Sequence, residues 1–167
     1  MGRQLHAAAS LVLMLVLAGT APAANVNWDG EGANSLWSTG ANWSTNAPPT
    51  AADDAIIDMD PGALIDATVA ANALDVIITN AEGSTGRLTM TGGALTVHKT
   101  GSGGPGLWIA NKGVGYFTMT GGVIVADNVY LPRNVPGQGY MTMDDGTITV
   151  GQAVTLGLHG REYGELT

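Results

Sequence analysis

The chain has 167 residues, which suits one domain and is too short for two full hydrophobic cores. Glycine accounts for 25 residues and cysteine is absent, so disulfide scaffolds, thiolate zinc sites and cysteine nucleophiles are all excluded. The formal net charge of -8 at pH 7 argues against a nucleic-acid partner, because neutralising phosphates requires a basic surface.

The first 23 residues have the pattern of a secretory signal peptide. Arg3 precedes an unbroken apolar run over 11–17, and small residues at 21 and 23 stand where a signal peptidase reads. The run is far shorter than the ~20 apolar residues that a membrane span needs. We therefore predict cleavage after Ala23 and an exported protein, located outside the cell, at the cell surface or in the bacterial outer membrane or periplasm.

An internal repeat is the strongest signal in the chain. The segment 86–93 (GRLTMTGG) recurs at 115–122 and again at 139–146, with spacings of 29 and 24 residues. A fourth copy opens at Gly164, shortly before the sequence ends. Because an open solenoid end exposes strand edges and core, we expect this chain to be the N-terminal part of a longer protein.

The repeat predicts an all-β fold, a parallel β-helix (β-solenoid) of about 24–29 residues per coil. Within each copy apolar and polar side chains alternate with the period of a strand, and Gly-Gly or Asp-Gly marks a corner. Stacking puts equivalent positions over one another, with apolar columns inside and a threonine column outside. An antiparallel meander is the alternative, because Gly-Gly is also a hairpin signal. The expected internal columns are Leu88/Phe117/Met141/Leu166, Met90/Met119/Met143, Leu95/Ile124/Ile148 and Val97/Ala126/Val150.

Composition divides the exported part into three regions. Residues 24–54 form a Trp-rich N-terminal cap, residues 55–85 form irregular first coils, and residues 86–167 form the regular coils. The coils are expected at 86–114, 115–138 and 139–163, with a truncated one from 164. Charge follows the same division, since residues 24–86 hold nine acids and neither lysine nor arginine.

Aromatic residues offer two interpretations. Large rings near the N-terminus suit a cap over the first coil, in which each indole N–H finds a partner. The alternative is a platform for sugars, because aromatic faces stack on pyranose rings. The candidate carbohydrate contacts are Trp28, Trp37, Trp43, Trp108 and Tyr130.

The opening NWDGEGANSLWSTGANW, followed by Pro-Pro and by Asp53-Asp54-Ala55-Ile56-Ile57, resembles the start of secreted bacterial β-solenoid proteins. These proteins carry autotransporter-associated β-strand repeats or PEP-CTERM sorting signals and are abundant in planctomycetes and verrucomicrobia. The LTMTGG, LTV and LWIAN segments are similar to repeats of the same group, and the resemblance covers residues 26–167. It implies an exported, passenger-like surface protein and no catalytic residues.

The sequence contains few motifs for catalysis or metal binding. His98 and His159 have no acid or nucleophile at a fixed spacing, and no serine-nucleophile, zinc-protease or phosphate-loop motif is present. Asp58-x-Asp60-x-Gly62 is a fragment of a calcium-loop pattern that lacks the distal glutamate. It is read as a turn, with a weak Ca²⁺ site at Asp53, Asp54, Asp58 and Asp60 as the alternative. No other cofactor is expected.

The leading hypothesis is an exported, non-enzymatic structural or adhesin-like β-solenoid, whose partners are extracellular glycans or other surface proteins. A carbohydrate-binding or polysaccharide-degrading β-helix is the alternative. Hydrolysis would need two carboxylates about 5–9.5 Å apart, and no acidic column recurs in the repeats. Ice binding by a threonine ladder is disfavoured, because Asp144 interrupts the Thr-x-Thr pattern in the third copy.

Overall fold

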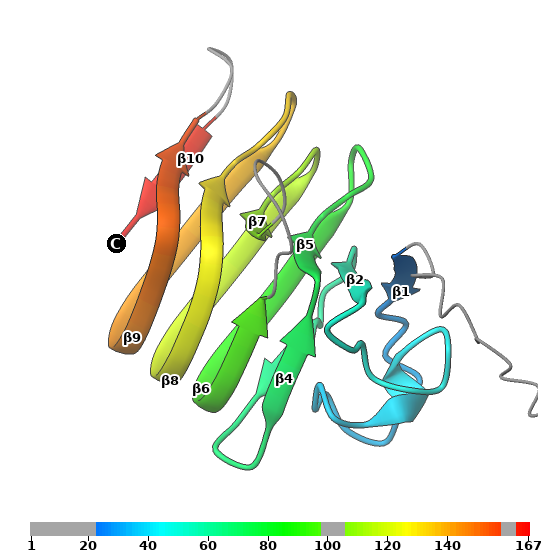
Figure 1. The fold of residues 1–167 in the computed structure, drawn as a ribbon. Helices are drawn as coiled ribbons and strands as arrows, with labels where there is room; N and C mark the ends of the chain where they lie inside the picture. Colours follow the sequence, from blue (N-terminus) through cyan, green and yellow to red (C-terminus); the bar gives the residue numbers. More distant parts are fainter. Residues whose placement is uncertain (1–22, 98–105, 158–162) are drawn as a thin grey trace, which may run out of the picture.

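The computed structural model describes residues 23–97, 106–157 and 163–167. Their strands form one 10-stranded sheet that winds into a parallel β-solenoid of about 5 turns, so the predicted fold is confirmed (Figure 1). Residues 1–22 of the predicted signal peptide and the candidates His98 and His159 lie outside the described residues. The strands are β1 Ala24–Asn27, β2 Asp53–Ile57, β3 Ala63–Ile65, β4 Ala70–Ala73, β5 Asp75–Ile78, β6 Thr85–Val97, β7 Leu107–Ile109, β8 Val114–Leu131, β9 Gln138–Leu156 and β10 Tyr163–Leu166.

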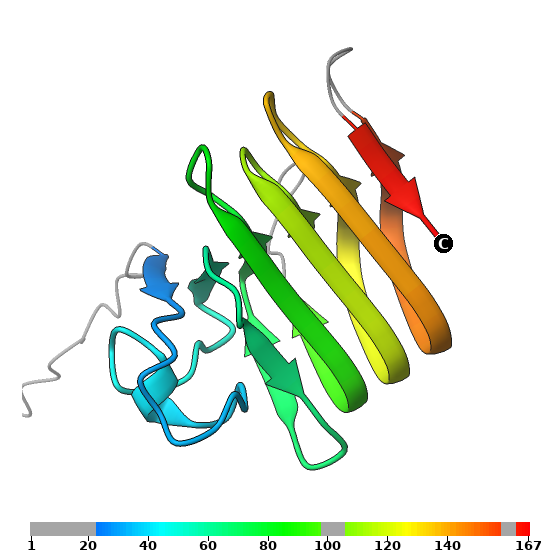
Figure 2. The ribbon, with the colours of Figure 1, turned by 180° about the vertical axis from the view of Figure 1, so that it is seen from behind.

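Each coil contributes strand segments to three faces, and Figures 1 and 2 show the stack from opposite sides. The first face holds β1, β2, β5, β7 and the last segments of β8 and β9. The second face holds β3, the first segments of β6, β8 and β9, and then β10. The third face holds β4 and the middle or last segments of β6, β8 and β9.

The side-chain columns expected from the repeat are present. Met90 pairs with Met119 and Met119 with Met143, and the first two side chains are fully buried. The threonine column lies outside, where Thr89 pairs with Thr118 and Thr118 with Thr142. A branched side chain suits that position on a pleated surface. Parallel pairing of β6, β8 and β9 thus excludes the antiparallel meander.

The sequence predicted separate short strands with glycine corners between them, whereas in the structure the strands continue through the corners. β6, β8 and β9 are 13, 18 and 19 residues long, because each continues through its glycine corner. The register between neighbouring coils shifts there, between Met90 and Ala94 for β6 against β8. Gly93 has a φ of +68° and Gly122 a φ of +97°, which glycine adopts without a Cβ clash. A bulge bends the strand, so the ladder continues from one face to the next.

The N-terminal regions contain more strand than the sequence indicated. β1 pairs in parallel with β2, and Leu36 forms a parallel bridge with Leu64. The predicted cap therefore also supplies a first, irregular coil. β4 was not predicted at all, because the sequence Ala-Ala-Asn-Ala has a low preference for strands, yet stacking on β6 forms it.

At the C-terminal end of the described stack, apolar side chains are open to solvent. Val154, Leu156 and Leu166 are 56%, 55% and 53% exposed. A cavity of about 200 Å³ there is lined by Val129, Met141, Met143, Ile148, Val150, Val154 and Leu166. The interior columns therefore end at an uncovered apolar surface.

Close backbone approach at Gly62 gives a direct test of the stacking. A Cβ on Gly62 would lie 1.7 Å from the carbonyl oxygen of Arg87 in the next coil. We expect Gly62→Ala to lower the free energy of unfolding by about 1–3 kcal/mol, since the coils would have to separate. Gly151→Ala is the control, because its nearest neighbour is the mobile end of the Asp127 side chain at 3.1 Å. Equal urea midpoints for both variants would contradict the predicted stacking.

Candidate functional site: an acid pair and two aromatic columns

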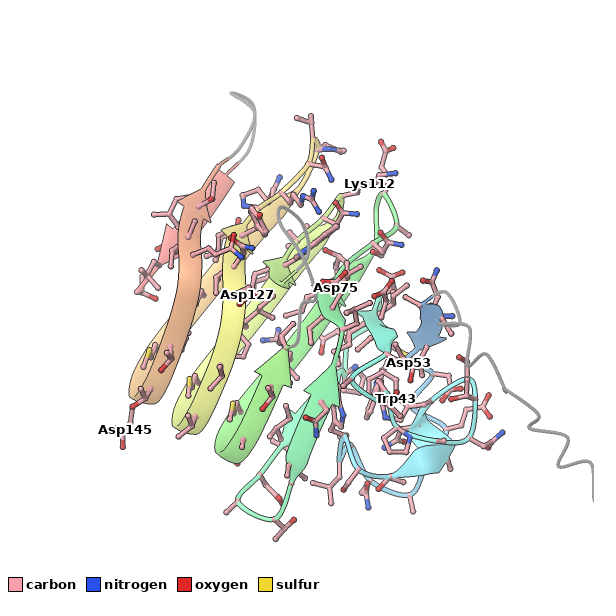
Figure 3. All side chains as sticks on the ribbon, viewed as in Figure 1. Trp43, Asp53, Asp75, Lys112, Asp127 and Asp145 are labelled. Carbon is pink, nitrogen blue, oxygen red and sulfur yellow. The ribbon has the colours of Figure 1, made fainter. Side chains whose placement is uncertain are left out.

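Two aspartates meet on the outer side of the first face. Asp54 of β2 and Asp75 of β5 are register partners in a parallel ladder, so their side chains leave the sheet on the same side, about 4.8 Å apart. Figure 3 labels Asp75 on β5. Asp75 is only 5% exposed, and within the described residues one buried oxygen of each carboxyl, Oδ1, has no hydrogen-bond partner. The sheet thus holds two acids together in a largely dry place.

The pair has an unusual protonation equilibrium. Burial is the main cause that raises the pKa of Asp75 to about 7, and the negative charge of Asp54 raises it further. The N–H of Gly106 and the charge of Arg133 act in the opposite direction. Burial also raises the pKa of Asp54, against the hydrogen bond that it shares with Asp75. Burial and the neighbouring charge therefore favour the neutral form of Asp75 up to about pH 7.

An aromatic column lies beside the pair on the same face. Trp108 of β7 pairs with Tyr130 of β8, and their ring centroids are 6.3 Å apart in an edge-to-face arrangement. The guanidinium carbon of Arg133 lies 3.9 Å from the Trp108 ring centroid and 5.3 Å from that of Tyr130. Both predicted sugar contacts are half-buried, and Arg133 occupies part of their ring surface.

The other three candidate sugar contacts form the cap. Trp28, Trp37 and Trp43 are 5%, 1% and 1% exposed, so no ring face among them is open to a sugar. Trp43 packs edge-on against both neighbours, with centroids 5.1 Å from Trp28 and 4.8 Å from Trp37. Its indole N–H donates to the backbone oxygen of Trp37 at 2.7 Å, whereas within the described residues the buried indole N–H groups of Trp28 and Trp37 have no acceptor, contrary to the expectation for the cap. Figure 3 shows Trp43 at the N-terminal end of the stack.

The four aspartates of the calcium hypothesis have separate partners. Asp53 accepts hydrogen bonds from Thr50, Asp58 accepts them from the backbone of Asn80 and Ala81, and Asp54 meets Asp75. Asp60 forms an ion pair with Arg87 at 3.2 Å. Within the described ranges, no three acidic or histidine side chains come close enough together to hold a metal ion.

A second aromatic column runs along the outer side of the second face. Arg87, Tyr116, Tyr140 and Glu165 are successive register partners. The Arg87 guanidinium lies 4.8 Å from the Tyr116 ring centroid, and the two tyrosine rings stack with centroids 5.1 Å apart and an interplanar angle of 14°. A cavity of about 210 Å³ opens beside this column. We call it the tyrosine cavity; its lining residues are Tyr116, Tyr140, Met141, Thr142, Glu165 and Thr167.

Sequence reasoning missed both the acid pair and the second aromatic column. Asp54 and Asp75 lie in the irregular coils, where no repeat defines the spacing that brings them together. Tyr116 and Tyr140 occupy the same position in successive copies of the repeat, so the signal for that column was present in the sequence. The column does not recur as one residue type, because Arg87 and Glu165 occupy the same position in the first and last copies.

Comparisons with known proteins supply no relative. The chain matches no protein-family profile, and neither a curated protein nor a solved structure shows significant similarity to it. In the described part of the chain, no helix has the length and apolar character needed to cross a membrane.

Proposed function

We propose that the protein is an exported, non-enzymatic β-solenoid that acts as a structural or adhesin-like element at the cell surface or in the extracellular matrix. One observation carries the proposal: the outer side of the second face presents the same residue positions from coil to coil, in parallel register. Such a surface offers repeated, weak contacts rather than a single reactive centre. The leader and the resemblance to secreted bacterial solenoid proteins support export.

The acid pair does not favour hydrolysis. In glycoside hydrolases the two carboxyls flank the substrate and stand about 5–9.5 Å apart. Asp54 and Asp75 are instead adjacent register partners of one parallel ladder, and Asp75 is buried. A structural role in joining two coils accounts for their geometry.

Processing and location test this proposal. The chain is expressed with its own leader in a Gram-negative host, the cells are fractionated, and the N-terminus of the product is determined by mass spectrometry. We expect a product that begins at Ala24, recovered outside the cytoplasm. Ala23→Phe is the control, since a bulky residue at the cleavage position should leave the leader attached. Unprocessed wild-type protein confined to the cytoplasm would refute export.

Carbohydrate binding is the second candidate function. Trp108 and Tyr130 favour it, because they stay half-buried on an outer face and are not part of the cap. Arg133 lies over both rings, so a sugar at that place would have to displace its side chain. Loss of glycan-array binding in Trp108→Ala, with binding kept in wild type, is the result that this candidate requires.

A further inference from the structure

Three asparagines stack at the corner that joins the first face to the second. Asn80 follows β5, Asn111 follows β7 and Asn134 follows the last segment of β8, so each lies in a turn that leads into the next coil. Figure 3 labels Lys112, the neighbour of Asn111, at this corner. Asn111 Nδ2 donates to Asn80 Oδ1 at 2.7 Å, and Asn134 Nδ2 donates to Asn111 Oδ1. We call these three residues the asparagine ladder.

Asn111 is the central member of the asparagine ladder. It is 6% exposed, and its side chain donates one hydrogen bond of the ladder and accepts the other. Its backbone N–H donates to the oxygen of Thr79 at 2.9 Å, and its backbone oxygen accepts from the N–H of Asn134 at 3.2 Å. A buried amide is costly to leave without partners. The position of Asn111 is therefore coupled to the coils on both sides of it.

The backbone of this corner has an uncommon conformation. Thr79 and Ala110, the residues directly before Asn80 and Asn111, have φ values of +62° and +73°. Residues with a side chain rarely adopt this left-handed region, and it persists only where the surrounding contacts enforce it. The hydrogen bonds of the asparagine ladder are contacts of this kind, because each joins one such turn to the next coil.

The turns that carry the asparagine ladder differ in length. The first two asparagines are 31 residues apart and the last two are 23 residues apart. The strands that follow them repeat with spacings of 29 and 24 residues instead. The amides nevertheless meet at each step. Contacts between side chains thus align the turns despite their unequal lengths, and each turn leads into a strand that lies in register with its neighbour.

The apolar columns by themselves leave an alternative register open. A slip of one residue is excluded, because it would turn the apolar side chains outward. A slip of two residues keeps them inside, since Phe117 would then lie over Met90 instead of Leu88. The glycine corners oppose such a slip only in part, because the pairing of β6 with β8 already shifts there. A further contact is needed to distinguish the two registers.

From these observations we propose that the asparagine ladder sets the register between successive coils. Its hydrogen bonds select one alignment among those that bury the same apolar columns. In the slipped register Asn111 would no longer face Asn80, and buried amides would lose their partners. The inference concerns the stacking of the coils and does not depend on the proposed surface role.

The test measures the register by cross-linking in solution. The chain has no cysteine, so engineered thiols are the only sites of reaction. Thr89→Cys with Thr118→Cys reports the native register, because the two residues are register partners on the outer side of the second face. Thr91→Cys with Thr118→Cys reports the register that is slipped by two residues. Dibromobimane becomes fluorescent only after it has joined two neighbouring thiols, and mass spectrometry identifies the product.

With the asparagine ladder intact, we expect the native pair to react and the slipped pair to react more slowly. In Asn111→Ala the rate of the slipped pair relative to the native pair should rise about tenfold or more, because the substitution removes two hydrogen bonds between amides. Asn72→Ala is the matched control, since it removes an exposed asparagine from β4, and it should leave this ratio unchanged.

Asn134→Ala keeps the proposal testable if Asn111→Ala does not fold. It removes only the step of the ladder between β8 and β9. The native pair for this step is Thr118→Cys with Thr142→Cys, and the slipped pair is Thr120→Cys with Thr142→Cys. We expect the relative rate of the slipped pair to rise here, while the ratio between β6 and β8 stays at its wild-type value.

Three results would overturn the proposal. The first is an unchanged ratio in folded ladder variants, and the second is an equal rise in Asn72→Ala. The third is a rise at both steps after Asn134→Ala, which would show that the substitution loosens the whole stack rather than one register. Circular dichroism and the urea midpoint establish that each variant is folded. Export is read from processing and fractionation, so the outcome for one proposal leaves the other unaffected.

Discussion

Asp75→Asn is expected to make the protein more stable than wild type at pH 8, by about 2–4 kcal/mol, and to flatten the dependence of stability on pH. Asparagine has the shape of the protonated acid and keeps an N–H donor for Asp54. It removes the buried group whose ionisation is unfavourable in the fold. The substitution thus reproduces at every pH the state that wild type holds only in acid.

The direction of this pH dependence follows from the pKa of Asp75 in the unfolded chain and in the fold. In the unfolded chain Asp75 titrates near 3.8, whereas burial and the charge of Asp54 raise its pKa in the fold to about 7. Below pH 3.8 both states are protonated and the fold has its full stability. Between about pH 4 and pH 7 the unfolded state loses its proton first, so the stability of the wild type falls as the pH rises. Above about pH 7 both states are ionised and the loss is complete.

Urea unfolding followed by circular dichroism at pH 4 to pH 8 measures this effect. The charged groups around the pair are Asp53, which raises the pKa of Asp54, and Arg133, which lowers that of Asp75. Asp144→Asn removes an exposed acid at a corner and should leave the wild-type profile unchanged. A profile in Asp75→Asn that still falls as steeply over this window would show that the raised pKa of Asp75 does not cause the pH dependence. A rise in wild-type stability on adding Ca²⁺ at pH 8 would show instead that a cation binds there.

Trp43→Ala should cost about 3–5 kcal/mol of folding free energy, the range for truncating a large buried aromatic side chain. Trp43 is 1% exposed and packs edge-on against Trp28 and Trp37. Its removal leaves a cavity at the centre of the cap and deletes the hydrogen bond to the Trp37 oxygen. The first coil would lose the contacts that close the N-terminal end.

Trp108→Ala provides the comparison for this prediction. Trp108 is half-buried on an outer face under Arg133, so its truncation opens no cavity within the solenoid. We expect it to cost less than half as much as Trp43→Ala in urea unfolding. Similar stabilities of the two variants would contradict the cap and reopen a ligand-binding role for the N-terminal tryptophans.

The regular coils could be predicted because their information is local and repeated. Positions such as Leu88, Phe117 and Met141 alternate with polar neighbours in every copy, which identifies the strand, its buried side and its partner in the next coil. Stacking itself then follows, since one coil cannot bury its apolar face alone. The irregular coils repeat nothing, so strand β4 and the pairing of β1 with β2 were not expected.

For the candidate binding sites, the sequence identified suitable residue types, but only the structure showed which of those residues are buried and which lie close together. Three of five predicted sugar contacts turned out to be buried in the cap, and the predicted calcium ligands are dispersed. Asp54 and Asp75, 21 residues apart in chain segments without any common motif, were brought together by the register of β2 and β5.

The repeat and the winding of parallel coils were thus determined by local patterns of this chain, because apolar spacing and glycine corners act over a few residues at a time. The raised pKa of Asp75 and the tyrosine cavity depend on which coil lies beside which. Contacts between coils join residues more than twenty positions apart. The pKa values and the accessible surfaces of these residues are therefore set only after the coils have stacked.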